Sequence, residues 1–324
     1  MIGTGLMGAR HAENVARNVA GARLVAVHDA SAESAARVAA SLGCAQSPDL
    51  DTLLARDDVD AVAIASPPRF HAAHAIAAAR ASKHVFLEKP MALTLQDADA
   101  INAAVAAAGV LLQIGFMRRY DPAYGAAYAA IRNGDIGEPR LFRGIGRDQD
   151  APSGPFGSVP RAAILTDSAI HDFDLARWLV ADEAVAVRAT ITLIGDRATV
   201  PCPNLALVDI RFARGAMANV ETLHGARYGY DIRAEVVGTE GTLFIGGHQR
   251  TALQLFTARG AQHDLPAHWL ERFADAYRLE LRDFVQAVLD RRPAAVTGAD
   301  GRRALAIALA ADEAGVRGTE VSLS

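Results

Sequence analysis

The stretch Gly3-Thr4-Gly5-Leu6-Met7-Gly8 has the spacing G-x-G-x-x-G and opens a segment with a helical pattern. The first glycine of this pattern permits a tight turn, the second lets a pyrophosphate approach the backbone, and the third lets helix and strand pack closely. Free N–H groups and the helix dipole then attract the phosphates. Because glycine-rich turns are common, the pattern alone is a weak signal. The residues that follow it strengthen the prediction of a dinucleotide site.

Asp29 ends the next predicted strand, about 20 residues beyond the glycines, where an acid accepts hydrogen bonds from the adenosine ribose hydroxyls. A carboxylate at this position repels a 2′-phosphate, so the sequence favours NAD over NADP. Only Met1 and Ile2 precede Gly3, although a complete strand is expected there. We therefore expect that the first strand is truncated and that the native start lies several residues upstream. The chain as written is expected to have weakened stability and cofactor binding.

The chain has 324 residues, which suggests about two domains, and 51% of them are hydrophobic, as in a soluble globular enzyme. A net charge of −4 offers no electrostatic attraction for nucleic acid or an anionic membrane. The two cysteines, Cys44 and Cys202, lie far apart, which argues against a disulfide framework and structural zinc. We expect no bound metal, and the sequence has neither a signal-peptide pattern nor an apolar run long enough for a membrane span. The expected compartment is the cytoplasm.

Residues 1–118 alternate short apolar strands with alanine-rich helices, a pattern typical of a doubly wound parallel sheet. The predicted strands are Leu24–His28, Ala61–Ala65, His84–Leu87 and Val110–Phe116, and the predicted helices are Ala9–Ala20, Ser31–Leu42, Arg69–Ala81 and Thr94–Ala108. Ser31 and Thr94 are candidate N-caps, and Gly43 and Gly109 are candidate C-caps. The fold class predicted for this part is α/β, with a Rossmann domain that binds NAD.

Residues 119–324 are predicted to form an α+β domain that binds substrate and forms oligomers. A helix over Asp121–Arg132 is followed by turns at Asn133–Asp135 and Gly137–Pro139 and by a loop over Ala151–Pro160. Closely spaced strands without intervening helices then indicate a largely antiparallel open sheet. These strands are Val185–Leu193, Leu205–Phe212, Met217–Leu223, Ile232–Val237 and Thr242–Ile245, and two helices, Trp269–Leu289 and Asp300–Ala314, follow them.

Lys89 follows the apolar run that begins at His84 and precedes Pro90, which cannot continue a sheet ladder. The lysine is therefore placed at a strand's carboxyl end, the edge at which open α/β sheets bind ligands. An amine there can orient a hydroxyl or a carbonyl. The alternative is a solvated loop lysine. Residues 66–71, Ser66-Pro67-Pro68-Arg69-Phe70-His71, follow another strand, where they line the nicotinamide side or form only a helix-start loop.

Asp167 and His171 are four residues apart in Asp167-Ser168-Ala169-Ile170-His171-Asp172-Phe173-Asp174. If this segment is helical from about Ser168, positions 167, 171 and 174 share one face and Asp172 points elsewhere. A neutral imidazole can accept the hydroxyl proton when an alcohol loses hydride, and a carboxylate can fix its tautomer. The alternative is an aspartate N-cap beside an unrelated surface histidine.

The glycine loop, Glu88-Lys89-Pro90 and Asp167-x-x-x-His171 together resemble the glucose–fructose oxidoreductase/inositol dehydrogenase/rhizopine-catabolism (Gfo/Idh/MocA) family, along nearly the whole chain and most sharply its inositol 2-dehydrogenase branch. Further matching strings are Gly115–Asp121, Ile136–Pro139, Tyr228–Ile232 and Glu235–Gly238. The resemblance implies a catalytic trio of Lys89, Asp167 and His171, in which His171 is the base, Asp167 orients it and Lys89 holds the reacting hydroxyl. It places Met117, Arg118, Asp148, Asp174 and Tyr230 in a polyol pocket, and Gly3, Gly5, Leu6, Met7, Gly8, Asp29, Ser66, Pro67, His71, Glu88 and Lys89 along the cofactor.

Asp148 is a departure from this resemblance. Inositol dehydrogenases commonly read Arg-Asn-Pro where this chain reads Arg147-Asp148-Gln149. A carboxylate accepts hydrogen bonds but cannot donate them as an amide does, which changes the hydroxyls that can be recognised. Tyr230 has the alternative of packing in the core, and Arg118 the alternative of a surface ion pair.

The expected activity is NAD-dependent oxidation of a secondary hydroxyl of an inositol-like cyclitol to a ketone, with the substrate bound in an interdomain cleft. Two alternatives stay open. One is a sugar or scyllo-inositol dehydrogenase on the same scaffold, using NAD or NADP. The other is a non-catalytic NAD/sugar sensor, as the galactose-pathway repressor of yeast resembles this fold without being an enzyme. The resemblance also implies a homotetramer, and no nucleic-acid or membrane partner is expected.

Overall fold

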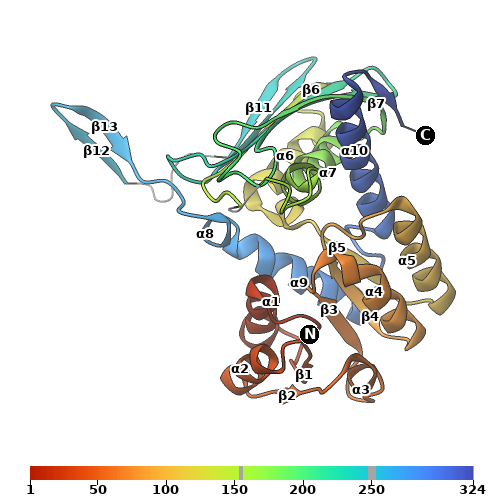
Figure 1. The fold of residues 1–324 in the computed structure, drawn as a ribbon. Helices are drawn as coiled ribbons and strands as arrows, with labels where there is room; N and C mark the ends of the chain where they lie inside the picture. Colours follow the sequence, from red (N-terminus) through yellow and green to blue (C-terminus); the bar gives the residue numbers. More distant parts are fainter. Residues whose placement is uncertain (153–155, 247–252, 324) are drawn as a thin grey trace. The chain divides into compact units, whose positions relative to one another are not determined.

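The computed structural model describes residues 1–152, 156–246 and 253–323 and divides into two compact units (Figure 1). The first unit contains Met1–Tyr120 and Asp275–Leu305, and the second contains Asp121–Ala274 and Ala306–Ser324. The division falls inside helix α10 (Gly298–Arg317). Part of the chain's C-terminal quarter therefore belongs to the unit that the N-terminal segment begins.

Parallel strands form the sheet of the first unit, as the βαβ pattern predicts. The strands are β1 (Ala26–Val27), β2 (Ala45–Gln46), β3 (Ala61–Ile64), β4 (His84–Glu88) and β5 (Leu112–Gly115). β1 pairs with β2, and β4 lies between β3 and β5. All four predicted strands lie within two residues of the observed ones. Leu24–His28 and Val110–Phe116 were predicted too long at both ends.

Ile2 connects the two halves of this sheet. It makes parallel bridges to His28 on one side and to Ile64 on the other. Its N–H donates to the Ala63 carbonyl at 2.8 Å, and the N–H of Gly3 donates to the His28 carbonyl at 2.8 Å. The strand order is thus β2-β1-Ile2-β3-β4-β5. This very short central segment pairs with the edges on both sides, which a truncated first strand was expected to leave open.

The helices of the first unit begin and end largely where the capping residues indicate. They are α1 (Leu6–Arg17), α2 (Ala32–Leu42), α3 (Leu50–Leu54), α4 (His71–Arg80), α5 (Leu95–Ala108) and most of α9 (Ala274–Asp290), with short 3₁₀ turns at Pro68–Phe70 and Met117–Tyr120. Ser31 and Thr94 accept N-cap hydrogen bonds, and Gly43 and Gly109 adopt left-handed C-cap conformations. α1 begins three residues before the predicted Ala9, because the glycine loop turns directly into the helix. β2 and α3 were not predicted.

A seven-stranded sheet organises the second unit. Its order is β11-β10-β6-β9-β8-β7-β14, and all neighbours are antiparallel except β6 and β9. The strands are β6 (Pro139–Asp148), β7 (Ala184–Thr192), β8 (Leu205–Phe212), β9 (Met217–His224), β10 (Asp231–Gly238), β11 (Thr242–Ile245) and β14 (Val321–Ser322). A separate hairpin pairs β12 (Gln254–Thr257) with β13 (Gly260–His263). The largely antiparallel sheet was predicted, but its inner strand β6 and its edge strand β14 were not.

The glycines of β6 explain why that strand was missed. Gly144 and Gly146 lack the branched side chains by which strands are recognised, and Pro139 reads as part of a turn. A Cβ built on Gly144 would lie 2.8 Å from Oδ1 of Asp172, and one on Gly146 would lie 3.4 Å from Oδ2. The glycines therefore leave room for a helix carboxylate against the strand.

Helices cover one face of the seven-stranded sheet. These are α6 (Pro122–Asn133), α7 (Ile170–Val180) and the later part of α10, whose buried residues share one hydrophobic core with the inward side chains of the strands (Figure 1). Phe142, Phe173 and Phe212 are central members of this core. A π-helical segment, Ile164–Ala169, leads directly into α7, and a short helix, α8 (Trp269–Arg272), precedes α9. Within the described ranges, we find no helix with the length and apolar composition of a bilayer span.

Gly8→Ala and Gly5→Ala form a matched test of the glycine loop. A Cβ on Gly8 would lie 2.0 Å from the Gly3 carbonyl oxygen, whereas one on Gly5 would meet nothing within 4 Å. Gly8→Ala is expected to lower the free energy of unfolding by about 1–3 kcal/mol because the loop must move. Gly5→Ala is expected to change it by less than about 0.5 kcal/mol. Urea unfolding without added nucleotide measures both, and equal losses would contradict the close packing at Gly8.

Candidate active site

Asp29 follows β1, beyond His28, and lies against the glycine loop. Its Oδ2 accepts hydrogen bonds from the N–H and the hydroxyl of Thr4, at 2.6 and 3.1 Å, and its Oδ1 accepts from the N–H of Ser31 at 2.8 Å. Partial burial alone would raise the pKa of Asp29, but these hydrogen bonds outweigh it and lower the pKa below its usual value. Asp29 is therefore a firmly ionised acceptor beside the loop, as the ribose hydroxyls of a dinucleotide require.

The N-terminus of α1 has the properties of a phosphate site. Gly5 is its N-cap, and no side chain in the described part of the chain caps this end through a hydrogen bond. Gly5 and Leu6 are exposed, and Leu6 exposes 66% of its surface. The loop and the first turn therefore fit a pyrophosphate that binds the free N–H groups. Met7 lies in this same turn, and Gly8 packs against Gly3 beneath it.

The segment that carries Lys89 is held on both sides by buried histidines. On one side, Oε1 of Glu88 lies 2.6 Å from Nε2 of His11, and Oε2 of Glu88 accepts the N–H of Lys89 at 3.1 Å. On the other side, Nδ1 of His71 lies 2.8 Å from the Pro90 carbonyl oxygen, and Nε2 lies 2.7 Å from that of Ser66. The backbone on either side of Lys89 is thus fixed to α1 and α4.

His71 contacts the backbone carbonyl of Ser66, another predicted cofactor residue. Burial lowers its pKa, although the two carbonyl oxygens favour the protonated ring. Pro67 is exposed and begins the turn that leads to His71. The hydroxyl of Ser66 lies 3.0 Å from Nδ1 of His74, one turn further along α4. The loop after β3 is therefore attached both to α4 and to the segment of Lys89.

Glu280 completes a buried cluster with His11 and Glu88. It lies on α9, is 0% exposed, and neither of its carboxyl oxygens has a hydrogen-bond partner among the described residues. One donor or acceptor atom of each of the three residues lies within 4.8 Å of the others. Burial, and next the negative charge of Glu88, raise the pKa of Glu280 well above its ordinary value. Glu280 is therefore expected to hold a proton at neutral pH.

Met117 and Arg118 lie in the 3₁₀ turn at the end of the first unit's first segment, and both are buried. Neighbouring residues attach this turn to the returning segment 275–305. Arg119 pairs with Asp300 at 3.2 Å, and the Tyr120 hydroxyl donates to Asp283 at 2.8 Å. Arg118 is 3% exposed, so the surface ion pair considered for it does not describe its position.

Asp167 and His171 occupy the junction between the π-helical segment and α7. Asp167 lies in the π-helical turns and is exposed, whereas His171 is the second residue of α7 and is buried. The helical region begins four residues before the predicted Ser168. Its first part has i→i+5 geometry, a form found mostly at functional sites. Asp172 lies against Gly144, consistent with a direction different from that of His171, and Asp174 is also buried.

Ser168 and His224 are functional candidates that the sequence analysis missed. The hydroxyl of Ser168 lies 2.8 Å from Nε2 of His224 at the end of β9. Asp148, at the end of β6, is the register partner of His224. Burial raises the pKa of Asp148, and the charges of Asp150 and Asp167 raise it further, while burial lowers the pKa of His224. Asp148 and His224 both lie close enough to Asp167 for its charge to raise their pKa values. The only sequence signal for His224 is its place at a strand end.

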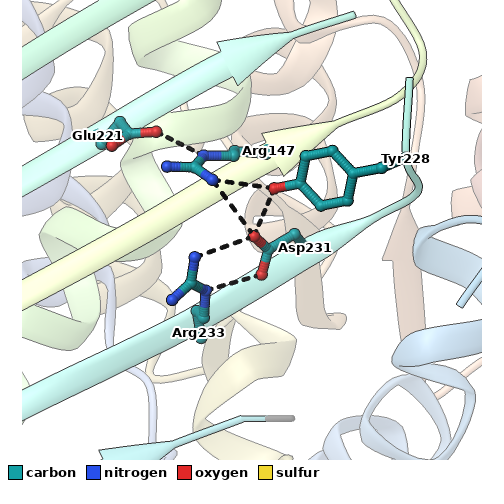
Figure 2. Close-up of polar contacts among 5 residues, drawn as sticks. All are labelled: Arg147, Glu221, Tyr228, Asp231 and Arg233. Carbon is teal, nitrogen blue, oxygen red and sulfur yellow. Dashed lines mark hydrogen bonds and ion pairs between the residues drawn. The ribbon is translucent and has the colours of Figure 1, made fainter. Parts of the chain in front are cut away.

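Arg147 lies on the opposite face of the sheet from Asp148. On that face, Nε of Arg147 donates a hydrogen bond to Oε1 of Glu221 at 2.6 Å, and Nη1 donates to the Tyr228 hydroxyl at 3.0 Å (Figure 2). Tyr228 donates to Asp231 at 2.6 Å, and Arg233 pairs with Asp231 at 3.0 Å. This network fixes the turn before β10. Tyr230 in that turn is buried, and its ring meets Phe273 edge-on with centroids 6.3 Å apart. Tyr230 therefore packs in the core, as the alternative considered for it states.

Glu280→Gln tests the protonated state of Glu280. A carboxyl group whose pKa is raised in the native state keeps its proton there, whereas in the unfolded chain it loses the proton above about pH 4.3. The free energy of unfolding therefore falls as the pH rises. The slope is about 1.4 kcal/mol per pH unit until the native pKa is reached. Glutamine does not titrate, so the variant lacks this pH dependence. The free energy of unfolding of Glu280→Gln should therefore rise relative to that of the wild-type chain between pH 5 and pH 8. Urea unfolding at several pH values measures it. The exposed Glu240→Gln is the control, and parallel curves for Glu280→Gln would contradict the protonated state.

Comparison with known proteins places this geometry in a family. The model of the oxidoreductase family with an NAD-binding Rossmann fold (GFO/IDH/MocA) matches residues 1–116, and that of the GFO/IDH/MocA C-terminal domain matches residues 124–244. The chain is 36% identical to scyllo-inositol 2-dehydrogenase (NAD⁺) of Bacillus subtilis, covering 100% of this chain and 95% of that protein. It is 34% identical to myo-inositol 2-dehydrogenase of Thermotoga maritima, covering 96% and 94%.

A solved structure gives the same result. The myo-inositol dehydrogenase of Lactobacillus casei, crystallised with NAD(H) and myo-inositol, matches with a TM-score of 0.92 and 28% identity, over 100% of this chain and 95% of that one. The relatives extend through both units of the fold. The chain therefore belongs to the Gfo/Idh/MocA family of NAD-dependent oxidoreductases.

Proposed function

We propose that this protein is an NAD-dependent dehydrogenase that oxidises a secondary hydroxyl of an inositol-like cyclitol to a ketone. The observation that carries the proposal is the environment of Lys89, whose backbone is fixed on both sides by buried hydrogen bonds at the end of a parallel strand. Such rigid placement of the backbone that carries an amine favours orientation of a reacting hydroxyl. The names of the relatives, which include both scyllo- and myo-inositol dehydrogenases, support the substrate class.

In the proposed reaction, His171 takes the hydroxyl proton as the carbinol carbon loses its hydride. NAD⁺ supplies the hydride acceptor when it is bound. Asp167 orients the imidazole and stabilises the imidazolium that forms. Lys89 donates a hydrogen bond to the reacting oxygen. Met117, Arg118, Asp148, Asp174 and Tyr230 contact the ring and its remaining hydroxyls.

The cofactor residues proposed here follow from the fit of the first unit. Asp29 accepts from the adenosine ribose hydroxyls, and the loop that contains Gly3, Gly5, Leu6, Met7 and Gly8 holds the pyrophosphate. Ser66, Pro67, His71, Glu88 and Lys89 lie toward the nicotinamide. Because Asp29 is ionised, a 2′-phosphate is repelled and NAD is preferred over NADP.

Turnover by matched variants tests the proposed chemistry. Purified protein with NAD and myo-inositol should produce NADH absorbance at alkaline pH. Lys89→Ala and His171→Ala should each lower kcat by about 10²–10⁴-fold, the usual contribution of acid–base catalysis. Lys83→Ala and His263→Ala remove the same side-chain types elsewhere in the chain and should leave kcat unchanged.

A panel of cyclitols and pyranoses assayed with both nicotinamide cofactors separates the alternatives. The expected result is highest turnover with a cyclitol and NAD, and the carboxylate at Asp148 makes the preferred isomer a property of this chain. A preference for pyranoses would indicate a sugar dehydrogenase, and a preference for NADP would contradict the role of Asp29. Cofactor binding without turnover of any of these substrates would favour the sensor.

The protein is also proposed to be a cytoplasmic homotetramer. Both cysteines are free thiols, as is usual in a reducing compartment. The face of the seven-stranded sheet away from α7 exposes Leu207, Met217 and Phe244 among its charged residues. Apolar side chains on an open sheet face suit contact with a second copy of the chain.

Light scattering after size-exclusion chromatography measures the assembly. The wild-type protein should have the mass of four chains. The double variant Leu207→Glu/Met217→Glu should dissociate to smaller species because it places charge on the outer face of the sheet. Val316→Glu, which changes an exposed apolar residue of α10, is the control and should remain a tetramer. A monomeric wild-type protein at micromolar concentration would contradict the proposal.

A further inference from the structure

The first unit contains a buried group of His11, Glu88 and Glu280, which we name the carboxyl–imidazole cluster. Its members come from α1, from the end of β4 and from α9, so three separate stretches of the first unit meet there. Relative exposures are 0% for His11, 7% for Glu88 and 0% for Glu280. Burial of polar groups at this depth costs free energy of folding unless hydrogen bonds compensate for it.

Glu88 connects the cluster to the backbone of Lys89. Its two oxygens are divided between His11, at 2.6 Å, and the N–H of Lys89, at 3.1 Å. Rotation of the Glu88 carboxylate would break both bonds together. The position of the Lys89 backbone therefore depends on a residue of α1 that lies 78 positions earlier in the chain.

The surroundings fix the two partners of this bond. The His11 ring meets Phe86 edge-on at a centroid distance of 5.3 Å and Tyr277 at 6.0 Å. Gly115 on the neighbouring strand leaves room for the carboxylate, since a Cβ there would lie 3.3 Å from Cδ and Oε1 of Glu88. The imidazole and the carboxylate thus have one arrangement that the packing permits.

Glu280 faces this pair with a carboxyl group that has no hydrogen-bond partner among the described residues. A second buried negative charge, on Glu280, would repel the Glu88 carboxylate and displace it from His11. A proton on Glu280 removes that repulsion and supplies a donor for the cluster. The α9 backbone is held close by, because Nε2 of Gln113 donates to the Glu280 carbonyl at 2.9 Å.

We infer that His11 and Glu280 are positioning residues for Lys89: His11 directs Glu88 at the Lys89 N–H, and a proton held on Glu280 keeps its carboxyl group from repelling Glu88. The inference rests on the proposed function for the role of Lys89. Neither His11 nor Glu280 is assigned a contact with substrate. Their effect reaches the reaction only through the placement of the lysine.

Steady-state kinetics of four variants test the inference. His11→Phe keeps an aromatic ring but loses the hydrogen bond, so kcat should fall about tenfold or more while the dissociation constant for NAD changes less than about threefold. Glu280→Gln keeps a neutral polar group and should retain kcat within about twofold of wild type, whereas Glu280→Asp, which draws the acid away from Glu88, should lower it. Thr94→Ala, which removes the N-cap of α5, controls for general destabilisation and should retain kcat. A His11→Phe enzyme as active as Thr94→Ala would overturn the positioning role.

Infrared spectroscopy gives a second measurement that needs no turnover. The wild-type protein at neutral pH should show the carbonyl stretch of a protonated carboxylic acid, and Glu280→Gln should lose that band. If the wild-type chain turns over no polyol, the proposed function fails, yet the band still decides the protonation of the cluster. Absence of the band would overturn the shared proton. So would one equivalent of divalent metal in the purified protein, lost in His11→Phe, because a metal would then replace the proton between these groups.

Discussion

The hydrogen bond between His11 and Glu88 connects the two parts of the first unit to which the proposed function assigns the cofactor and the reacting hydroxyl. It joins the helix that follows the glycine loop to the strand end that carries Lys89, over 2.6 Å, with the His11 side chain fully buried and 9% of the Glu88 side chain exposed. The hydrogen bond therefore fixes the position of helix α1 relative to the end of strand β4. A site that must hold a nucleotide at one end and orient a hydroxyl at the other needs this rigidity.

Local sequence patterns predicted much of this fold because the signals concerned are local. The caps at Ser31, Thr94, Gly43 and Gly109 each involve backbone within four residues, and the βαβ alternation depends on neighbouring segments. Strand β6 was not recognised from local patterns. Its glycines leave room for Asp172, which lies 28 residues away from Gly144 in the sequence. Its identity as a strand is visible only from its partners β9 and β10.

Candidate site residues could be named from the sequence where they belong to a motif, and could not be named where only packing brings them together. Lys89 and His171 stand in recognisable strings. Glu280 does not, since it lies on an amphipathic helix and reads as one charge among many. Only the return of residues 275–305 to the first unit brings it to Glu88. The π-helical turns before α7 were missed for a related reason, because an i→i+5 segment has the same composition as an α-helix.

Three carboxyl groups show how environment assigns different roles to one functional group. Asp29 receives hydrogen bonds from Thr4 and Ser31, which hold its pKa low, so it acts as an acceptor. Glu280 has no such donors among the described residues and faces Glu88, so burial and the charge of Glu88 raise its pKa well above its ordinary value. Asp148 lies between these extremes, because burial and the charges of Asp150 and Asp167 raise its pKa while the N–H of Asp150 donates to it. Under the proposed function, the proton on Asp148 decides whether this side chain accepts or donates a hydrogen bond at a polyol hydroxyl.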